Sequence, residues 1–550
     1  MCGAAESGIL HLVDELLLNI IDHIDAHDTL CNLATTCMRF QGLTEPYIWR
    51  KLLVIKGEHA RRIATAFDSR EERIEYIHDL SIRYQDDYRD GIENLNHFMG
   101  LMSKLRHLTI ETPCPNNDEW RSGVYFDGHS RIDYTNLLAS AVYPRIGISL
   151  ALPTLQSLTL HGHGSGDNKF TLGRAVAMFK HPTLRKIVLS CLNLDARISA
   201  EFDISEQELR STPLQSLKLI ECNVGVPFLD AVLSLPKALK ELSIGERLHT
   251  FEGCEPSRDP KQRSSSATFL TALQKQKDSL QRLTHCGGHV AWLTPRENDP
   301  EGSTKLRSFV NLEHLELGLE SHVYYYLRQN GFPPALKTLE MLDTAISINA
   351  GHDLRSLSDI AFRSLTSLVT DHLPAALSPD FTLHLKFSEH SFIITQLFNL
   401  ADPAEQSELL SVLFFDRPAT YKIANTMKSY NSRFLVSREM FPLGKSYIPP
   451  YMYGEDLPVE ALMYDSADFW RFNGVNYQLH DDEDFRDALG KSDKLMVCLE
   501  CRERGHGVDT CLNLGDGSPC LPCRNASLQE CTWERDENGQ LVFLEDQKIE

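Results

Sequence analysis

Hydrophobic positions near the start of the chain recur with a helical period. In the stretch HLVDELLLNIIDHID (residues 11–25), aliphatic side chains cover roughly half of a helical wheel drawn at about 100° per residue. They are Leu12, Leu16, Leu17, Ile20, Ile21 and Ile24. Packing against one core needs an apolar stripe of only about 100°. The pattern therefore predicts an amphipathic helix with more apolar surface than one core requires.

Two more helices are predicted directly after this one. In DTLCNLATTCMRF (28–40), Asp28 is a suitable N-cap residue and the leucines recur on one side. In TEPYIWRKLLVI (44–55), Thr44 is the expected cap. Pro46 would then lie in the first turn, where its missing N–H removes no helical hydrogen bond. Residues 8–56 thus read as a three-helix module.

A six-residue pattern, L-x-x-L-x-[LIMH], then recurs eight times, with Ile187 as the one replacement of the middle leucine. The copies lie at 105–110, 155–160, 184–189, 214–219, 239–244, 280–285, 312–317 and 336–341. Several steps between them fit a leucine-rich repeat of about 20–29 residues, and the longer steps require insertions. Each copy predicts a short strand whose apolar face is covered by its neighbours. We expect an α/β fold with an irregular leucine-rich-repeat solenoid over 95–375, and LTSLVT (365–370) as a ninth copy.

The remainder of the chain has a different character. Residues 376–495 lack the repeat pattern and mix helical with turn-rich stretches, so no fold is assigned to them. Six cysteines fall within 496–534, and an acidic tail occupies 535–550.

Composition and charge narrow the functional classes. A chain of 550 residues with 42% hydrophobic residues is long enough for several domains with buried cores. Its formal net charge of −21 disfavours general binding to nucleic acids or membranes. No uncharged apolar run reaches the length of a bilayer span, and the N-terminus lacks the basic lead-in of a signal peptide. We expect a cytoplasmic or nuclear protein in which disulfides seldom persist.

The N-terminal module resembles an F-box. The resemblance covers HLVDELLLNIIDHIDAHDTLCNLATTCMRFQGLTEPYIWRKL (11–52), with an acid before ELL, an aliphatic helix, an HDTL turn and a TC-R-F segment. One departure is Val13, where the family usually has proline after the first leucine. Proline would stiffen the start of the helix, but its absence removes no contact face.

This resemblance implies docking to the Skp-type adaptor of a cullin-based ubiquitin ligase. The family positions that contact the adaptor correspond to Leu12, Leu16, Leu17, Ile20, Ile24, Leu30, Leu33 and Cys37. Leu43 and Trp49 are expected to hold the module together. The alternative interpretation is that the three helices only cap the end of the repeat array, since solenoid ends need covering.

F-box proteins with leucine-rich repeats use the repeats to select a target protein, and we expect the same division of labour here. Independently of the resemblance, a repeat array presents the variable positions of its strands at fixed spacing. These positions are His107, Thr109, Ser157, Thr159, Lys186, Val188, Ser216, Lys218, Glu241, Ser243, His314, Glu316, Thr338 and Glu340.

The cysteine cluster predicts zinc. Thiolates two residues apart reach one ion, so Cys498, Cys501, Cys520 and Cys523 match a single tetrahedral site. The alternative adds Cys511 and Cys531 and holds two ions. The six-cysteine order resembles the fungal binuclear zinc cluster, which implies bridging by Cys498 and Cys520 and a fungal source. The nine residues between Cys501 and Cys511 depart from the usual six.

DNA binding by this cluster is disfavoured because residues 498–531 carry three arginines against five acids. No phosphate loop, dinucleotide fingerprint or nucleophile–base pattern occurs either. We therefore expect a non-catalytic, substrate-recruiting ligase subunit that contacts the adaptor, through it a cullin, and an unidentified target protein. The alternatives are a transcription regulator with the cysteine cluster on DNA, or an F-box protein that acts outside a ligase.

Overall fold

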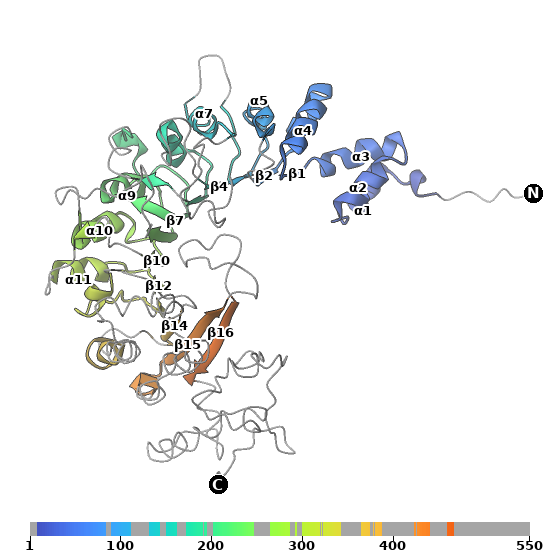
Figure 1. The fold of residues 1–550 in the computed structure, drawn as a ribbon. Coiled ribbons are helices and arrows are strands. Elements are labelled where there is room, and N and C mark those ends of the chain that lie inside the picture. The colour runs from blue at the N-terminus through green and yellow to red at the C-terminus, as the bar shows by residue number, and fades with distance from the viewer. Residues whose placement is uncertain are drawn as a thin grey trace, which may run out of the picture. The chain divides into compact units, whose positions relative to one another are not determined.

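The computed structural model shows an α/β protein in which short parallel strands alternate with helices (Figure 1). It describes residues 8–83, 90–111, 131–143, 150–161, 172–190, 192–194, 202–246, 264–286, 292–293, 300–318, 321, 323–342, 365–373, 378, 380–387, 423–424, 426–440 and 459–466. The chain divides into two compact units. The first comprises Met1–Leu239 and Thr250–Glu255, and the second comprises Lys240–His249 and Pro256–Glu550.

The first unit begins with the 3₁₀ turn η1 (Ile9–His11) and three helices. These are α1 (Asp14–Ile21), α2 (His27–Ala34) and α3 (Met38–Ile48). Leu17, Ile21, Leu30 and Phe40 form their shared core, and Leu43 packs against it as expected.

The boundaries of the second and third helices differ from the sequence prediction. The second helix ends at Ala34, and the third begins at Met38 rather than after Thr44. Thr44 is therefore a buried helical residue whose hydroxyl donates to the Phe40 carbonyl oxygen (2.7 Å) instead of capping an end. Pro46 lies near the C-terminal end of α3, which ends two residues later at Ile48. A proline inside a helix removes a hydrogen bond and favours its termination.

Six parallel strands of the first unit follow in spatial order. They are β1 (Lys51–Val54), β2 (Asp79–Arg83), β3 (His107–Glu111), β4 (Ser157–His161), β5 (Lys186–Ser190) and β7 (Ser216–Val224), with the short β6 (Asn193–Leu194) on β7. The intervening helical segments are α4 (Gly57–Ser69), η2 (Glu71–Tyr76), η4 (Ile92–Leu95), α5 (Asn96–Met99), α7 (Tyr134–Ser140), η5 (Gly173–Lys180), η6 (Glu206–Glu208) and α9 (Val226–Leu233). Helices α4, α5 and α7 lie on one side of the strands (Figure 1).

The second unit also contains six parallel strands in its described residues. They are β8 (Glu241–Glu246), β10 (Arg282–Cys286), β12 (His314–Leu317), β13 (Thr338–Leu342), β14 (Thr382–Phe387) and β15 (Arg433–Met440), followed by the antiparallel β16 (Val459–Asp465). A separate pair joins β9 (Ser264–Ser265) to β11 (Trp292–Leu293). Helical segments are α10 (Ser266–Leu273), η8 (Gln274–Gln276), α11 (Pro300–Arg307), α12 (Val323–Leu327) and η9 (Leu368–His372).

All eight copies of the leucine pattern contain a strand, as predicted, and the middle aliphatic residue of each copy is buried. These residues are Leu108, Leu158, Ile187, Leu217, Leu242, Leu283, Leu315 and Leu339. The prediction of a ninth strand at 365–370 is wrong, because residues 365–373 are helical. Its buried residues Leu365, Leu368 and Val369 recur at i, i+3 and i+4, which suits a helix face.

The parallel strands also extend beyond the range 95–375 that the repeats predict. Strands β1 and β2 precede it, while β14 and β15 fall within 376–495, the stretch without a sequence-based assignment. Strand β1 replaces the expected end of the third helix, because Lys51–Val54 pairs in register with β2. No helix in the described part of the chain combines the length and the hydropathy needed to cross a bilayer.

Candidate docking surface on the N-terminal helices

The wide apolar arc of the first helix is divided between two environments. Leu17 and Ile21, each 1% exposed, face the core of the three-helix module. Val13, Leu16 and Ile20 lie beside them at i, i+3 and i+7 and are 58%, 49% and 44% exposed. The surplus apolar area predicted from the sequence is therefore a stripe at the protein surface.

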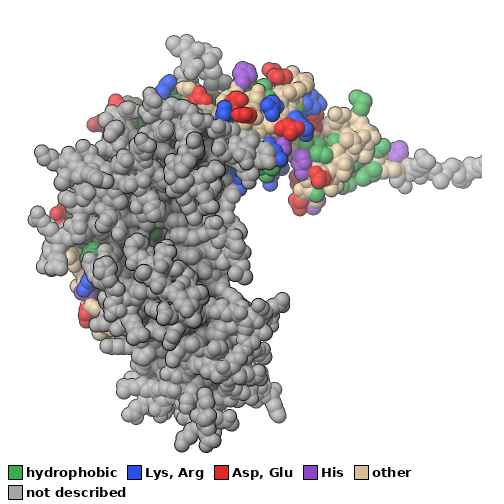
Figure 2. Space-filling model, viewed as in Figure 1, with side chains coloured by type: hydrophobic (Ala, Val, Ile, Leu, Met, Phe, Trp, Pro, Cys, Tyr) green, Lys and Arg blue, Asp and Glu red, His purple; other side chains and the backbone are tan. Residues whose placement is uncertain are grey.

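Further apolar side chains are exposed close to this stripe in sequence. Within the described residues, six of the thirteen exposed large hydrophobic side chains lie within residues 9–48, the part of the module that forms η1 and the three helices. They are Ile9, Leu10, Val13, Leu16, Ile20 and Met38, and we call them the apolar surface of the module. Figure 2 shows hydrophobic side chains on the outside of these helices, among acidic and histidine side chains. This concentration of exposed apolar groups makes the three helices the candidate docking surface of the described residues.

The eight residues predicted from the F-box resemblance fall into three groups. Leu16 and Ile20 are exposed. Leu12, Ile24, Leu33 and Cys37 are half-buried and pack against the module core. Leu17 and Leu30 are core residues with only 1% and 6% exposure, so they are corrected from docking residues to structural ones. A helical wheel defines the width of an apolar arc, but it does not show which edge of that arc faces the chain's own core.

Arg39 of α3 fixes the segment that precedes α1. Its guanidinium donates to the carbonyl oxygens of Leu10 and Leu12, the latter at 2.7 Å, and to the Asp14 carboxylate at 2.6 Å. Hydrogen bonds that involve ionised groups are stronger than neutral ones. Arg39 therefore positions η1 and the start of α1, which carry much of the apolar surface.

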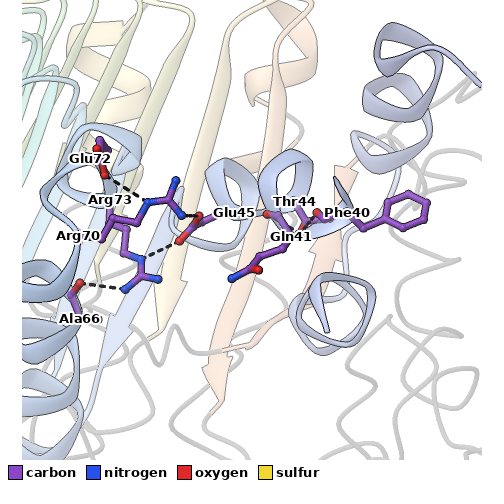
Figure 3. Close-up of polar contacts among 8 residues, drawn as sticks. All are labelled: Phe40, Gln41, Thr44, Glu45, Ala66, Arg70, Glu72 and Arg73. Atoms are coloured by element: carbon purple, nitrogen blue, oxygen red, sulfur yellow. Dashed lines mark hydrogen bonds and ion pairs between the residues drawn. The ribbon is translucent and has the colours of Figure 1, made fainter. Parts of the chain in front are cut away.

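Glu45 attaches the module to the helical segment that follows strand β1 (Figure 3). Its side chain is buried, and its carboxylate accepts hydrogen bonds from Arg70 and from Nε of Arg73, the latter at 2.7 Å. Arg73 also donates to the Ala66 carbonyl oxygen at 2.9 Å. We call Glu45, Arg70 and Arg73 the clamp. It joins α3 to residues 25 and 28 positions further along the chain.

Aromatic contacts reinforce the same junction. The Arg73 guanidinium lies 5.2 Å from the centre of the Trp49 ring. The Trp49 ring in turn is 5.5 Å from that of Phe67 in α4, and Phe67 is 5.3 Å from Phe98. Trp49 therefore packs outward on the first strand–helix unit rather than holding the three-helix module together by itself.

Replacing Val13 by proline is expected to stabilise the start of α1 by roughly 0.4–1 kcal/mol. Val13 has φ −67° and follows the extended Leu12, both of which suit proline. Among the described residues, the Val13 amide donates no backbone hydrogen bond, whereas the Leu12 amide bonds the Ile9 carbonyl oxygen at 3.1 Å. Thermal unfolding measures the effect. Leu12→Pro is the control and should destabilise; a lower midpoint for Val13→Pro would contradict the expectation.

Sequence reasoning missed part of this site. Ile9 and Leu10 went unassigned because they precede the periodic stretch, and Met38 was predicted in the last turn of the second helix rather than as the first residue of the third. The clamp was missed because its three charged residues come from distant segments and no local pattern links them. The signal available was an acid, Glu45, placed between the apolar residues of a helix.

The other predicted sites are only partly described. The variable positions on the strands are at least partly exposed, as expected, and they alternate with buried leucines. Cys498, Cys501, Cys511, Cys520, Cys523 and Cys531 all lie outside the described residues. Within the described part of the chain, no three His, Cys, Asp or Glu side chains gather as a metal site. Zinc binding by the six cysteines therefore stays a prediction.

Comparison with models of known protein families gives no match to this chain. Comparison with curated proteins gives none either.

Proposed function

We propose that this protein recruits a target protein to a Skp/cullin/F-box ubiquitin ligase. The observation that supports this most is the exposed stripe of Val13, Leu16 and Ile20 beside the buried Leu17 and Ile21. A helix that lays an apolar face into a groove on its partner is a common mode of protein recognition. The resemblance of residues 11–52 to an F-box identifies the expected partner as a Skp-type adaptor.

The chain itself supplies binding and position in this proposal, and partner proteins supply the chemistry. Arg39 holds the apolar surface in place, and the clamp transmits that position to the strands of the first unit. A target bound on those strands would stay near the transferring enzyme. Holding two reactants together in this way accelerates their reaction by proximity.

Co-purification tests the proposal. The full chain is co-expressed with a Skp-type adaptor and a cullin, as wild type and as Leu16→Asp plus Ile20→Asp. We expect the wild type to retain both partners and the double variant to bind the adaptor at least about tenfold more weakly, because each aspartate would have to be desolvated in an apolar contact. The variant should still fold, because both replaced side chains are exposed.

Leu101→Asp plus Val310→Asp is the matched control, since these side chains are 53% and 50% exposed and lie outside the module. Adaptor binding by the control should equal that of the wild type. Undiminished adaptor binding by Leu16→Asp plus Ile20→Asp would refute the docking surface. Recovery of the adaptor without the cullin would refute the assignment to a ligase while leaving the docking surface intact.

A further inference from the structure

Basic side chains gather at the edge of the first unit where its strands begin. Six of them are exposed: Arg50, Lys51, Lys104, Arg106, Arg185 and Lys186, which we call the basic edge. Two residues open each strand of this unit, and among those twelve residues the single acid is Asp79. Such a concentration of positive charge stands out in a chain whose formal net charge is −21.

In the part of the chain that the structure describes, the cations of the basic edge form no ion pairs. Within the described residues, none of the six lies within 4.0 Å of a carboxylate oxygen, and Asp79 faces His107 instead, at 3.8 Å. Exposed lysines and arginines usually form a solvated surface on which nearby acids neutralise their charge. Among the described residues no carboxylate pairs with these six cations, so ion pairs there do not neutralise their positive charge.

The corresponding edge of the second unit shows the ordinary arrangement. There Arg282 lies 4.0 Å from Glu241, and Lys337 lies 3.0 Å from Glu313. The same strand positions in the two units thus differ in electrostatics, although their strands are alike. Repeat geometry therefore does not require the charge of the basic edge.

A nearby histidine is affected by this charge. Burial lowers the pKa of His78, and Arg50, Arg106 and Lys104 lower it further, while Asp79 raises it. His78 directly precedes β2, which lies between β1 and β3. The cations at the start of β1 and those just before β3 therefore lie on either side of it. These cations therefore act together on one short stretch of the edge.

The cations recur on alternate strands. Arg50 and Lys51 open β1, Arg106 precedes β3, and Arg185 and Lys186 open β5, while the intervening β2 and β4 begin with His78–Asp79 and Gln156–Ser157. Adjacent strands are about 4.8 Å apart, so neighbouring cation groups are separated by roughly 9.6 Å. A polyproline II segment rises about 3.1 Å per residue with three residues per turn, which places every third side chain on one face about 9.3 Å apart.

We propose that the basic edge binds an extended acidic segment of a partner protein that carries carboxylates at every third residue. The match between the two spacings supports this ligand, as does the lack of ion pairs between the basic edge and the described acids. A nucleic acid is the less favoured occupant, because the strongly negative chain repels a long polyanion. This inference refines the proposed function by naming the surface that holds the target, but its test does not involve the adaptor.

Fluorescence anisotropy with the full chain tests the inference. The probe is a labelled twelve-residue peptide of repeating Glu-Pro-Pro, and its control is an isomer of the same composition with all glutamates consecutive. We expect the periodic peptide to bind more tightly than the isomer and to dissociate as salt is raised. Arg106→Glu plus Arg185→Glu should weaken binding about tenfold, since two attractive contacts become repulsive.

Lys237→Glu plus Lys277→Glu is the matched control, because it changes the net charge equally at exposed positions off the basic edge. Equal binding by the two double variants would overturn the inference, as would equal binding of the periodic peptide and its isomer. Tighter binding of a single-stranded RNA of equal charge would also overturn it. The Arg106→Glu plus Arg185→Glu variant should retain the adaptor, and the Leu16→Asp plus Ile20→Asp variant should retain the peptide, so failure of one proposal is distinct from failure of the other.

Discussion

Replacement of Glu45 by alanine is expected to lower the free energy of unfolding by about 3 kcal/mol, the low end for breaking a buried ion pair. The carboxylate is 7% exposed and receives hydrogen bonds from both Arg70 and Arg73. Its removal leaves the Arg73 guanidinium, itself only 20% exposed, without a counter-charge. The thermal midpoint of the full chain should fall, and limited proteolysis should cut sooner between α3 and α4.

Arg70→Ala is the matched control for this prediction. The Arg70 side chain is 45% exposed and therefore well solvated, so its loss should cost about 1 kcal/mol or less. Arg73 would continue to neutralise Glu45 in that variant. Equal midpoints for Glu45→Ala and the wild type would show that the clamp contributes nothing to the junction.

The strands were the most predictable part of this fold. Leu108 and Ile110, or Leu158 and Leu160, alternate with polar residues over a short range, and that alternation determines which side of a strand is buried. Strand β2 was not predicted because its segment reads IHDLSI (77–82), with Ile77 in place of the first leucine of the pattern. A buried position of this kind accepts any apolar residue of suitable shape, whereas the repeat pattern has leucine there.

Helix boundaries in the N-terminal module were less predictable. Thr44 and Pro46 together have the sequence signature of a helix start, yet α3 runs through both of them. Contacts with the core residues of α1 and α2 bury Phe40 and extend the helix toward its N-terminus. Tertiary packing thus overrode the local signal, which is common for propensities of this size.

The docking surface and the clamp mark two further limits of the sequence. The wheel showed that α1 carries too much apolar surface, and only the fold showed that Leu17 faces inward while Leu16 faces outward. The clamp depends on Glu45 and Arg73 meeting across 28 positions. Neither hydrophobic periodicity nor residue spacing reports such a long-range pair.

The second large effect concerns His181, which is buried at the end of η5 with only 1% exposure. Burial lowers its pKa from 6.5 to about 4, and the nearby Leu152 backbone opposes this shift. Its Nδ1 accepts a hydrogen bond from the Thr183 amide at 3.3 Å, which requires a neutral ring with the proton on Nε2. The folded protein therefore disfavours protonation of a group that the unfolded chain protonates readily.

Because the folded pKa of His181 lies below its unfolded value, its contribution to stability is complete above about pH 6.5 and is lost as the pH falls toward 4. Between pH 7.5 and pH 5.0 this one group should lower the free energy of unfolding by about 2 kcal/mol.

Denaturant titrations at the two pH values measure this loss. His181→Asn keeps an acceptor for the Thr183 amide but does not titrate, so its stability should depend less on pH by that amount. His97→Asn, at an exposed position on α5, should behave like the wild type. An unchanged pH dependence in His181→Asn would mean that the ring is protonated as easily in the folded chain as in the unfolded one.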